Sequence, residues 1–138
     1  MIRKVFLDTN ILIDWLTNRQ PFVGFAEKIL VLHVEYDFDL FVSALSLANA
    51  AYTLDKGNVR PHDAITKLLR WTKTIDLTRS IVEEAAQSRF NDFEDGLQYF
   101  SAKSVVNIDV IITRNKKDFK HSSILIQSPE EFVASFTK

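Results

Sequence analysis

Short apolar runs alternate along the chain with segments whose apolar residues recur every three or four positions. The runs are typical of short strands buried in a parallel sheet, and they cover residues 5–7, 39–42, 74–77, 110–112 and 124–126. The periodic segments predict helices over 11–18, 22–35, 44–55, 61–72, 81–86 and 91–106, and one more after Pro129. Strands that alternate with helices predict an α/β fold, a three-layer α/β/α sandwich with a central parallel sheet of about five short strands.

The chain of 138 residues contains no internal repeat or linker, so residues 1–138 are expected to form a single domain. The first strand begins close to Met1 and no apolar run approaches the roughly 20 residues of a membrane span, so we expect a cytoplasmic protein with no signal peptide and no membrane contact. The absence of cysteine excludes disulfides, thiolate zinc sites and cysteine nucleophiles. A net charge of −1 means that nucleic acid would have to bind to a local basic patch.

Polar side chains stand directly after two of the apolar runs. Asp8, Thr9 and Asn10 follow the first strand, and Asn115 lies shortly after the strand at 110–112. Parallel α/β sheets bind ligands at the carboxyl edge, where such residues gather, so Asp8 is a candidate metal-binding carboxylate. Asp8 or Asn10 can equally act only as the N-cap of the next helix, and these residues alone leave both interpretations open.

Acidic residues also open the helix over 91–106, where Asp92 and Asp95 lie one turn apart. They can serve as an N-cap and as a complement to the helix dipole. However, the acids around them would repel one another unless a cation binds, and Mg²⁺ and Mn²⁺ prefer such oxygen ligands. The helix over 44–55 is apolar nearly all round and should be buried, with Ser46, Asn49 and Thr53 forming a polar stripe that lines a site.

Four segments together resemble the PIN domain, in the family's order and over nearly the whole chain: residues 6–10, 43–52, 92–95 and 112–119. The resemblance implies a metal-dependent nuclease that hydrolyses RNA phosphodiester bonds with Mg²⁺ or Mn²⁺ and leaves 5′-phosphate and 3′-hydroxyl ends. Many bacterial members are VapC-type toxins, so a possible antitoxin protein and a homodimer are also expected.

Residue by residue, Asp8 matches the family's first acid, Asp95 the third and Asp92 an accessory acid. Asn115 stands where the fourth acid is usual, three residues before Asp118, and Asn49 stands where most members carry Glu. The resemblance therefore implies two overlapping sets, catalytic residues Asp8, Asp95, Asn49 and Asn115, and metal ligands Asp8, Asp95, Asp92 and Asp118.

Other polar residues would orient or hold the substrate. Thr9, Asn10 and Thr113 are expected to orient water, metal or the scissile phosphate through hydrogen bonds. A basic run directly after Asn115 is expected to bind RNA phosphates, through Arg114, Lys116, Lys117 and Lys120, with His121 beside them. The run can also be an ordinary solvated loop.

Two other functions compete with the nuclease. Asn49 brings no charge to the site, which predicts weak metal binding and leaves open a degenerate PIN domain that binds RNA or a protein. A haloacid dehalogenase-like phosphatase also begins with an Asp after its first strand. That chemistry needs a second Asp two positions on, where this chain has Asn10.

Overall fold

The computed structural model describes residues 1–136 and places five strands in one sheet. The strands are β1 (Lys4–Leu7), β2 (Asp39–Ser43), β3 (Lys73–Ile75), β4 (Val110–Ile112) and β5 (Leu125–Gln127). All pairings are parallel and the spatial order is β3-β2-β1-β4-β5, so β1 lies at the centre between β2 and β4. The residues that follow β1, β2 and β4 therefore lie side by side at the carboxyl edge.

Helices connect the strands: α1 (Thr9–Leu16), α2 (Val23–Tyr36), α3 (Ala44–Lys56), α4 (His62–Trp71), α5 (Arg79–Ala86), α6 (Phe93–Lys103) and α7 (Pro129–Ala134). Ser43 and Thr78 cap α3 and α5, and Ser128 opens α7 with a capping box. A short 3₁₀ helix, η1 (Lys116–Phe119), was not predicted and carries part of the basic run. The helix predicted over 91–106 is shorter in the structure, because α6 ends at Lys103 and the exposed Val106 lies beyond it.

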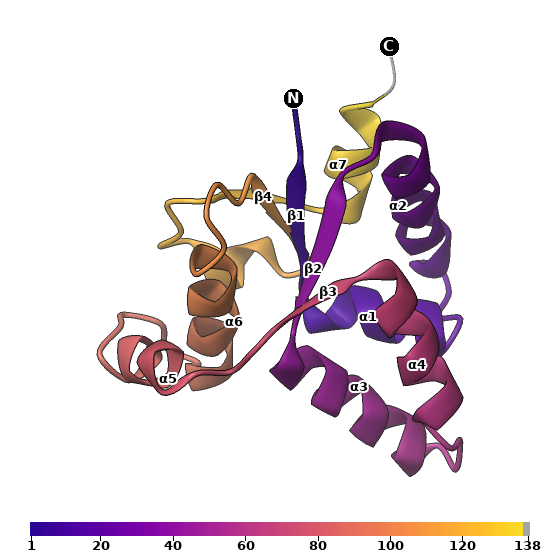
Figure 1. Ribbon diagram of the computed structural model, residues 1–138, viewed down its shortest axis with the longest axis horizontal. Helices are drawn as coiled ribbons and strands as arrows, with labels where there is room; N and C mark the ends of the chain where they lie inside the picture. Colours follow the sequence, from indigo (N-terminus) through magenta and orange to yellow (C-terminus); the bar gives the residue numbers. More distant parts are fainter. Residues whose placement is uncertain (137–138) are drawn as a thin grey trace.

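Successive residues of β1 point to opposite faces of the sheet and belong to two separate cores. Val5 and Leu7 pack in the core beneath α1, α2 and α7, whereas Phe6 packs in the core beneath α5 and α6. Figure 1 shows α5 and α6 on one side of the strands and α1, α2 and α7 on the other. The three-layer α/β/α sandwich with a parallel sheet is confirmed. Within residues 1–136, none of the helices has the length and apolar character of a bilayer span.

The prediction that α3 is buried nearly all round is wrong. Its fully buried residues, Ser46, Ala50 and Leu54, lie on one face, and Tyr52 is 64% exposed. The helix packs mainly against α1 rather than between layers, so only one stripe is covered. That stripe includes the polar Ser46, which reaches the carboxyl edge of the sheet.

Candidate functional site

Asp8 directly follows β1 and is the N-cap of α1, with only 8% of its surface exposed. Its Oδ1 accepts hydrogen bonds from the Thr9 backbone N–H (2.9 Å) and Gln98 Nε2 (3.1 Å). Its Oδ2 accepts from Thr113 Oγ1 (2.7 Å) and Asn10 Nδ2 (3.3 Å). Asp8 therefore caps a helix, as one interpretation predicted, and also lies at the centre of a polar site, while its role as a metal ligand stays a prediction.

β4 brings its own polar residues to Asp8 because it pairs with β1. The backbone N–H of Asp8 donates to the Ile112 carbonyl (3.0 Å), which places the next residue, Thr113, against the Asp8 carboxylate. Asn115 lies at the start of η1, and its backbone N–H donates to Thr113 Oγ1 (3.0 Å). The sequence prediction that the ends of these two strands meet is confirmed.

α6 contributes acids from the facing side. Asp92 caps the helix by accepting from the Asp95 backbone N–H (3.0 Å), and Glu94 and Asp95 lie in the first turn. A hollow in the surface, called here the Asp8 hollow, is lined by Asp8, Thr9, Asn10, Ile13, Asp92, Glu94, Asp95, Gln98 and Asn115. Two elements distant in sequence thus present carboxylates to the same space.

The surroundings of Asp8 and Asp95 disfavour the negative charge of both carboxylates. Burial raises the pKa of Asp8 above its ordinary value, although hydrogen bonds from Thr113, Thr9 and Gln98 oppose the shift. Partial burial, together with repulsion from Asp92, Asp118 and other acids, raises the pKa of Asp95 to about 7. Within residues 1–136, none of the ion pairs involves Asp8 or Asp95. Among the described residues, the groups that donate to the Asp8 carboxylate are all neutral.

Asn49 reaches the Asp8 hollow indirectly. Its Nδ2 donates to Glu94 Oε1, so the amide on α3 holds a carboxylate on α6 that lines the hollow. Glu94 also contributes to the raised pKa of Asp95. Ser46 and Asn49 thus contact residues that line the hollow, whereas none of the predicted polar stripe, Ser46, Asn49 and Thr53, lines it directly.

The predicted RNA-binding residues do not lie together. Lys117, Asp118 and Lys120 line a second hollow next to the first, called here the basic hollow, which shares Asp92 and Asp95 with it and also includes Arg89, Phe90, Asn91 and His121. Lys116 instead pairs with Glu131, at 2.9 Å from Nζ to Oε1.

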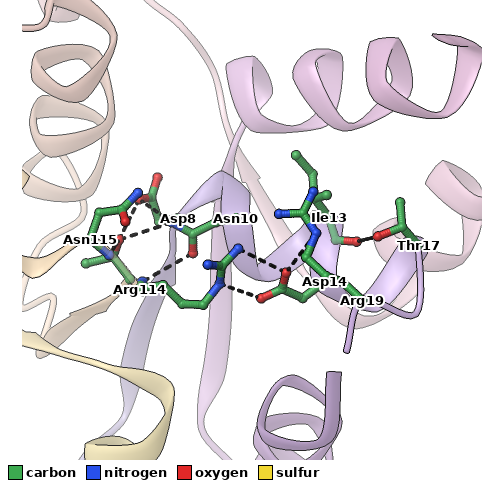
Figure 2. A network of polar contacts seen from close by, with 9 residues as sticks. Asp8, Asn10, Ile13, Asp14, Thr17, Arg19, Arg114 and Asn115 are labelled. Carbon is green, nitrogen blue, oxygen red and sulfur yellow. Dashed lines mark hydrogen bonds and ion pairs between the residues drawn. The ribbon is translucent and has the colours of Figure 1, made fainter. Parts of the chain in front are cut away.

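Arg114 points away from both hollows. Its Nε and Nη2 donate to the Asp14 carboxylate at 2.9 and 3.2 Å, and its guanidinium lies 3.9 Å from the ring centre of Phe22. Figure 2 shows the Arg114 side chain extending from the strand end toward Asp14 and Arg19, with Asp8 and Asn115 on its other side. This side chain is engaged in a buried ion pair.

Sequence reasoning missed two buried polar residues, Gln98 and Asp14. Gln98 lies one turn after Asp95 on α6, a spacing that puts both on one helix face. Asp14 interrupts the apolar run of α1, and an acid among core positions signals a buried partner. Both signals were present in the sequence, but neither identifies the partner.

The donors around Asp8 fit a divalent cation in their chemistry. Carboxylate and amide oxygens from Asp8, Asp95 and Asn115 are ligands that Mg²⁺ or Mn²⁺ accepts, with water completing the coordination. Within the described part of the chain, no three acidic or histidine side chains are already gathered tightly enough to form a closed metal cage. An open, partly water-filled coordination shell is the form that these residues suit.

Comparison with known proteins agrees with the fold. The family model described as PIN domain matches residues 4–117, most of the chain. The chain therefore belongs to the PIN-domain family, whose nucleases generally use divalent metal ions. This confirms the resemblance found in the sequence.

Two solved structures are similar over almost their full length. A toxin–antitoxin complex from Klebsiella pneumoniae has a TM-score of 0.69 at 20% identity, covering 91% of this chain and 98% of that chain. VapBC2 from Rickettsia felis bound to a promoter DNA fragment has a TM-score of 0.71 at 20% identity, covering 93% and 98%. At this identity the similarity shows the fold. No curated protein matches the sequence.

Proposed function

We propose that this protein is a metal-dependent endoribonuclease and the toxin of a toxin–antitoxin pair. The observation that carries the proposal is the Asp8 hollow, where carboxylates from Asp8 and α6 converge at the carboxyl edge and, among residues 1–136, no cationic side chain pairs with Asp8 or Asp95. Family membership supports nuclease chemistry, and the similar toxin–antitoxin structures support an antitoxin partner. RNA as substrate, a homodimer and a cytoplasmic location belong to the same proposal.

The bound cation, Mg²⁺ or Mn²⁺, would supply a more acidic water and stabilise negative charge on the phosphate. Asp8 and Asp95 would hold it, with Asn115 and Asp92 close by and Asp118 across the boundary with the basic hollow. Thr113 Oγ1 and Asn10 Nδ2 fix Oδ2 of Asp8, so the carboxylate presents a defined orientation before any ligand arrives. Thr9 lines the same hollow and would orient water or phosphate.

The RNA backbone would cross the basic hollow, where Lys117 and Lys120 lie beside Asp95 and Asp118. Lysine ammonium groups hold phosphates without regard to sequence. Lys116 and Arg114 are expected to contribute less, since each already pairs with an acid of the protein.

Asn49 favours a second candidate, a PIN domain that binds RNA or a partner protein without cleaving. An amide where the family usually carries a carboxylate leaves the surroundings of the cation with one negative charge fewer, which weakens metal binding. Asn49 nevertheless holds Glu94 at the rim of the hollow, so a carboxylate remains close by. We therefore place a slow enzyme ahead of an inert one.

Cleavage of a mixed RNA pool by purified protein, with Mg²⁺ or Mn²⁺ and with chelator, tests the proposal. We expect cleavage that requires the metal and that Asp8→Asn and Asp95→Asn abolish. Glu84→Gln, an exposed acid on α5 outside both hollows, is the matched control and should cleave normally. Activity that persists in chelator or in both Asp variants would contradict metal-dependent cleavage, whereas RNA binding without cleavage would favour the second candidate.

A further inference from the structure

Gln98 is a polar side chain buried beneath the Asp8 hollow, with only 2% of its surface exposed. Although it belongs to α6, its amide contacts Asp8, which follows β1, and Ser43, the last residue of β2. A buried amide is costly unless its donors and acceptor are satisfied, and here every polar atom has a partner. The side chain therefore joins three elements at the carboxyl edge of the sheet.

The orientation of the amide is set by Ser43. Gln98 Oε1 can only accept, and it accepts from Ser43 Oγ at 2.5 Å. Ser43 Oγ is itself held in place because it accepts from the Ser46 backbone N–H (2.9 Å) as the N-cap of α3. The Nε2 group must consequently face Asp8, Thr9 and Ser46, because a flipped amide would place its carbonyl oxygen against the Asp8 carboxylate.

Nε2 has two hydrogens and three acceptors. Ser46 Oγ lies at 2.6 Å, Thr9 Oγ1 at 2.9 Å and Asp8 Oδ1 at 3.1 Å, so the bond to Asp8 is the longest of the three. The two hydroxyls also bond to each other at 2.7 Å. Gln98 can therefore release Asp8 and keep both hydrogens engaged by Ser46 and Thr9.

The Asp8 carboxylate needs a hydrogen-bond donor that a metal ion can displace. A carboxylate has about four lone-pair positions, and four protein donors already occupy those of Asp8. A cation that binds Oδ1 must displace a donor from it. The Thr9 backbone N–H is fixed by the helix, so the shared hydrogen of Gln98 is the one that can yield at little cost.

We propose that Gln98 is a positioning residue for Asp8. Its amide, oriented by Ser43, holds the Asp8 carboxylate in place before a cation binds. When a cation binds, the amide releases Oδ1 of Asp8 and keeps its hydrogen bonds to Thr9 and Ser46. The proposal rests on the proposed function, because it assumes that Asp8 binds a divalent ion. It assigns a role in metal binding to two side chains, Gln98 and Ser43, that do not themselves contact the ion.

The first test is a double-mutant cycle read by calorimetric titration with Mn²⁺. Gln98→Met keeps the length of the side chain but removes both donors, and we expect a loss of Mn²⁺ affinity on the order of 10-fold to 100-fold, as for residues that orient metal ligands. Ser43→Ala frees the amide to rotate and should cost several-fold. In the Gln98→Met background, Ser43→Ala should cause no further loss, because its effect acts through the amide.

Thr78→Ala is the matched control. Thr78 caps α5 as Ser43 caps α3, but it lies outside the polar network, so this variant should lose comparable helix stability and keep the wild-type Mn²⁺ affinity. If Ser43→Ala and Thr78→Ala change affinity equally, or if the losses from Gln98→Met and Ser43→Ala simply add, the positioning role is refuted.

The second test needs no enzyme activity. In an NMR spectrum of the metal-free protein, the two Gln98 side-chain amide protons should be resolved and protected from exchange, and Mg²⁺ should shift them selectively. Should the wild-type protein bind neither Mn²⁺ nor Mg²⁺, the proposed function fails and this proposal with it. If the wild type binds and Gln98→Met binds equally tightly, or the amide protons exchange freely, only the role of Gln98 is overturned.

Discussion

Two buried aspartates, one at the start of α1 and one near its end, have different kinds of partners for their negative charge. Asp14, near the end of α1, is 1% exposed and accepts from the Arg114 guanidinium at 2.9 and 3.2 Å, with Arg19 at 4.0 Å. Asp8, at the start of α1, is 8% exposed, and all its donors among residues 1–136 are neutral groups. Figure 2 shows the two environments side by side, with Arg114 between them and its guanidinium bonded to Asp14.

We propose that the difference separates a structural charge, at Asp14, from a functional one, at Asp8. Burying a carboxylate is unfavourable, and a guanidinium fork is the usual way to offset the cost within a protein. At Asp8 the chain leaves the charge without a cation, and burial raises the pKa. The positive charge that Asp14 receives from the protein is one that Asp8 would receive from a bound ion.

Asp8→Asn should give the largest effect, and it should fall on activity rather than on folding. A bound cation supplies several kcal/mol of charge stabilisation, so we expect RNA cleavage to fall on the order of a thousandfold. The free energy of unfolding of the metal-free protein should hold or rise, because a buried charge is removed. Single-turnover cleavage and thermal denaturation of the same sample measure both, and a strong loss of stability would remove the distinction from Asp14.

Asp14→Asn should show the reverse pattern. Loss of the carboxylate leaves Arg114 largely buried without its partner, and the free energy of unfolding should fall by about 3 kcal/mol. As long as the variant remains folded, its Mn²⁺ affinity should stay close to that of the wild type. Urea denaturation gives the stability change, and an unaltered midpoint would show that this ion pair is not the structural charge described here.

Metal binding should depend on pH through Asp95, whose pKa is raised from 3.8 to about 7 by burial and by the neighbouring acids. The ion must displace the proton, so Mn²⁺ affinity should fall up to about tenfold per pH unit below that value. In the metal-free protein the raised pKa favours folding at low pH. Its contribution to stability is complete below pH 3.8 and is lost as the pH rises through about 7.

Titrations across this pH range check the prediction, with Asp95→Asn as the reference. An affinity that does not vary with pH in the wild type would contradict the convergence of acids around Asp95.

Lys117→Ala and Lys120→Ala should each lower the slope of log affinity for RNA against log salt by about one, uniformly across sequences. Lys116→Ala is the matched control, because Lys116 pairs with Glu131 and lies outside the basic hollow. RNA-binding titrations at several salt concentrations give the slope for each of the three variants. Equal slopes for all three variants would show that the basic hollow does not hold the RNA backbone.

Arg19→Ala should give the smallest effect. Arg19 is 48% exposed and lies 4.0 Å from Asp14, a geometry worth about 0.5 kcal/mol or less. Thermal denaturation should barely distinguish this variant from the wild type. A loss comparable with that of Asp14→Asn would mean that Arg19, rather than Arg114, neutralises the buried charge.

The sequence predicted which residues meet at the carboxyl edge, because strand ends in a parallel sheet are fixed by topology. Asp8 and the residues after the strand at 110–112 were found in this way, whereas Asp95, on α6, came from the resemblance to the PIN domain; the helix caps at Ser43 and Thr78 follow from local rules. Side-chain pairing across elements could not be read from the sequence. The sequence predicted an RNA contact for Arg114, whereas in the structure its guanidinium pairs with Asp14. The hydrogen bond from Asn49 to Glu94 depends on how α3 and α6 face each other.

The helix α3 shows the same limit. Its apolar composition suggested burial on all sides, yet the exposure of Tyr52 depends on α3 packing against α1 at one side of the molecule. Periodicity identifies a helix and its apolar residues, but the number of neighbours around it is a property of the assembled layers.

Calorimetric titration of Mn²⁺ into the wild type and Asp8→Asn, at a pH above the pKa of about 7 of Asp95, tests the central claim most directly. We predict saturable binding by the wild type and a loss of affinity of at least about tenfold in Asp8→Asn, equivalent to 1.4 kcal/mol. Equal binding by both proteins, or no binding by the wild type, would contradict the claim that Asp8 is a buried charge left for a metal ion.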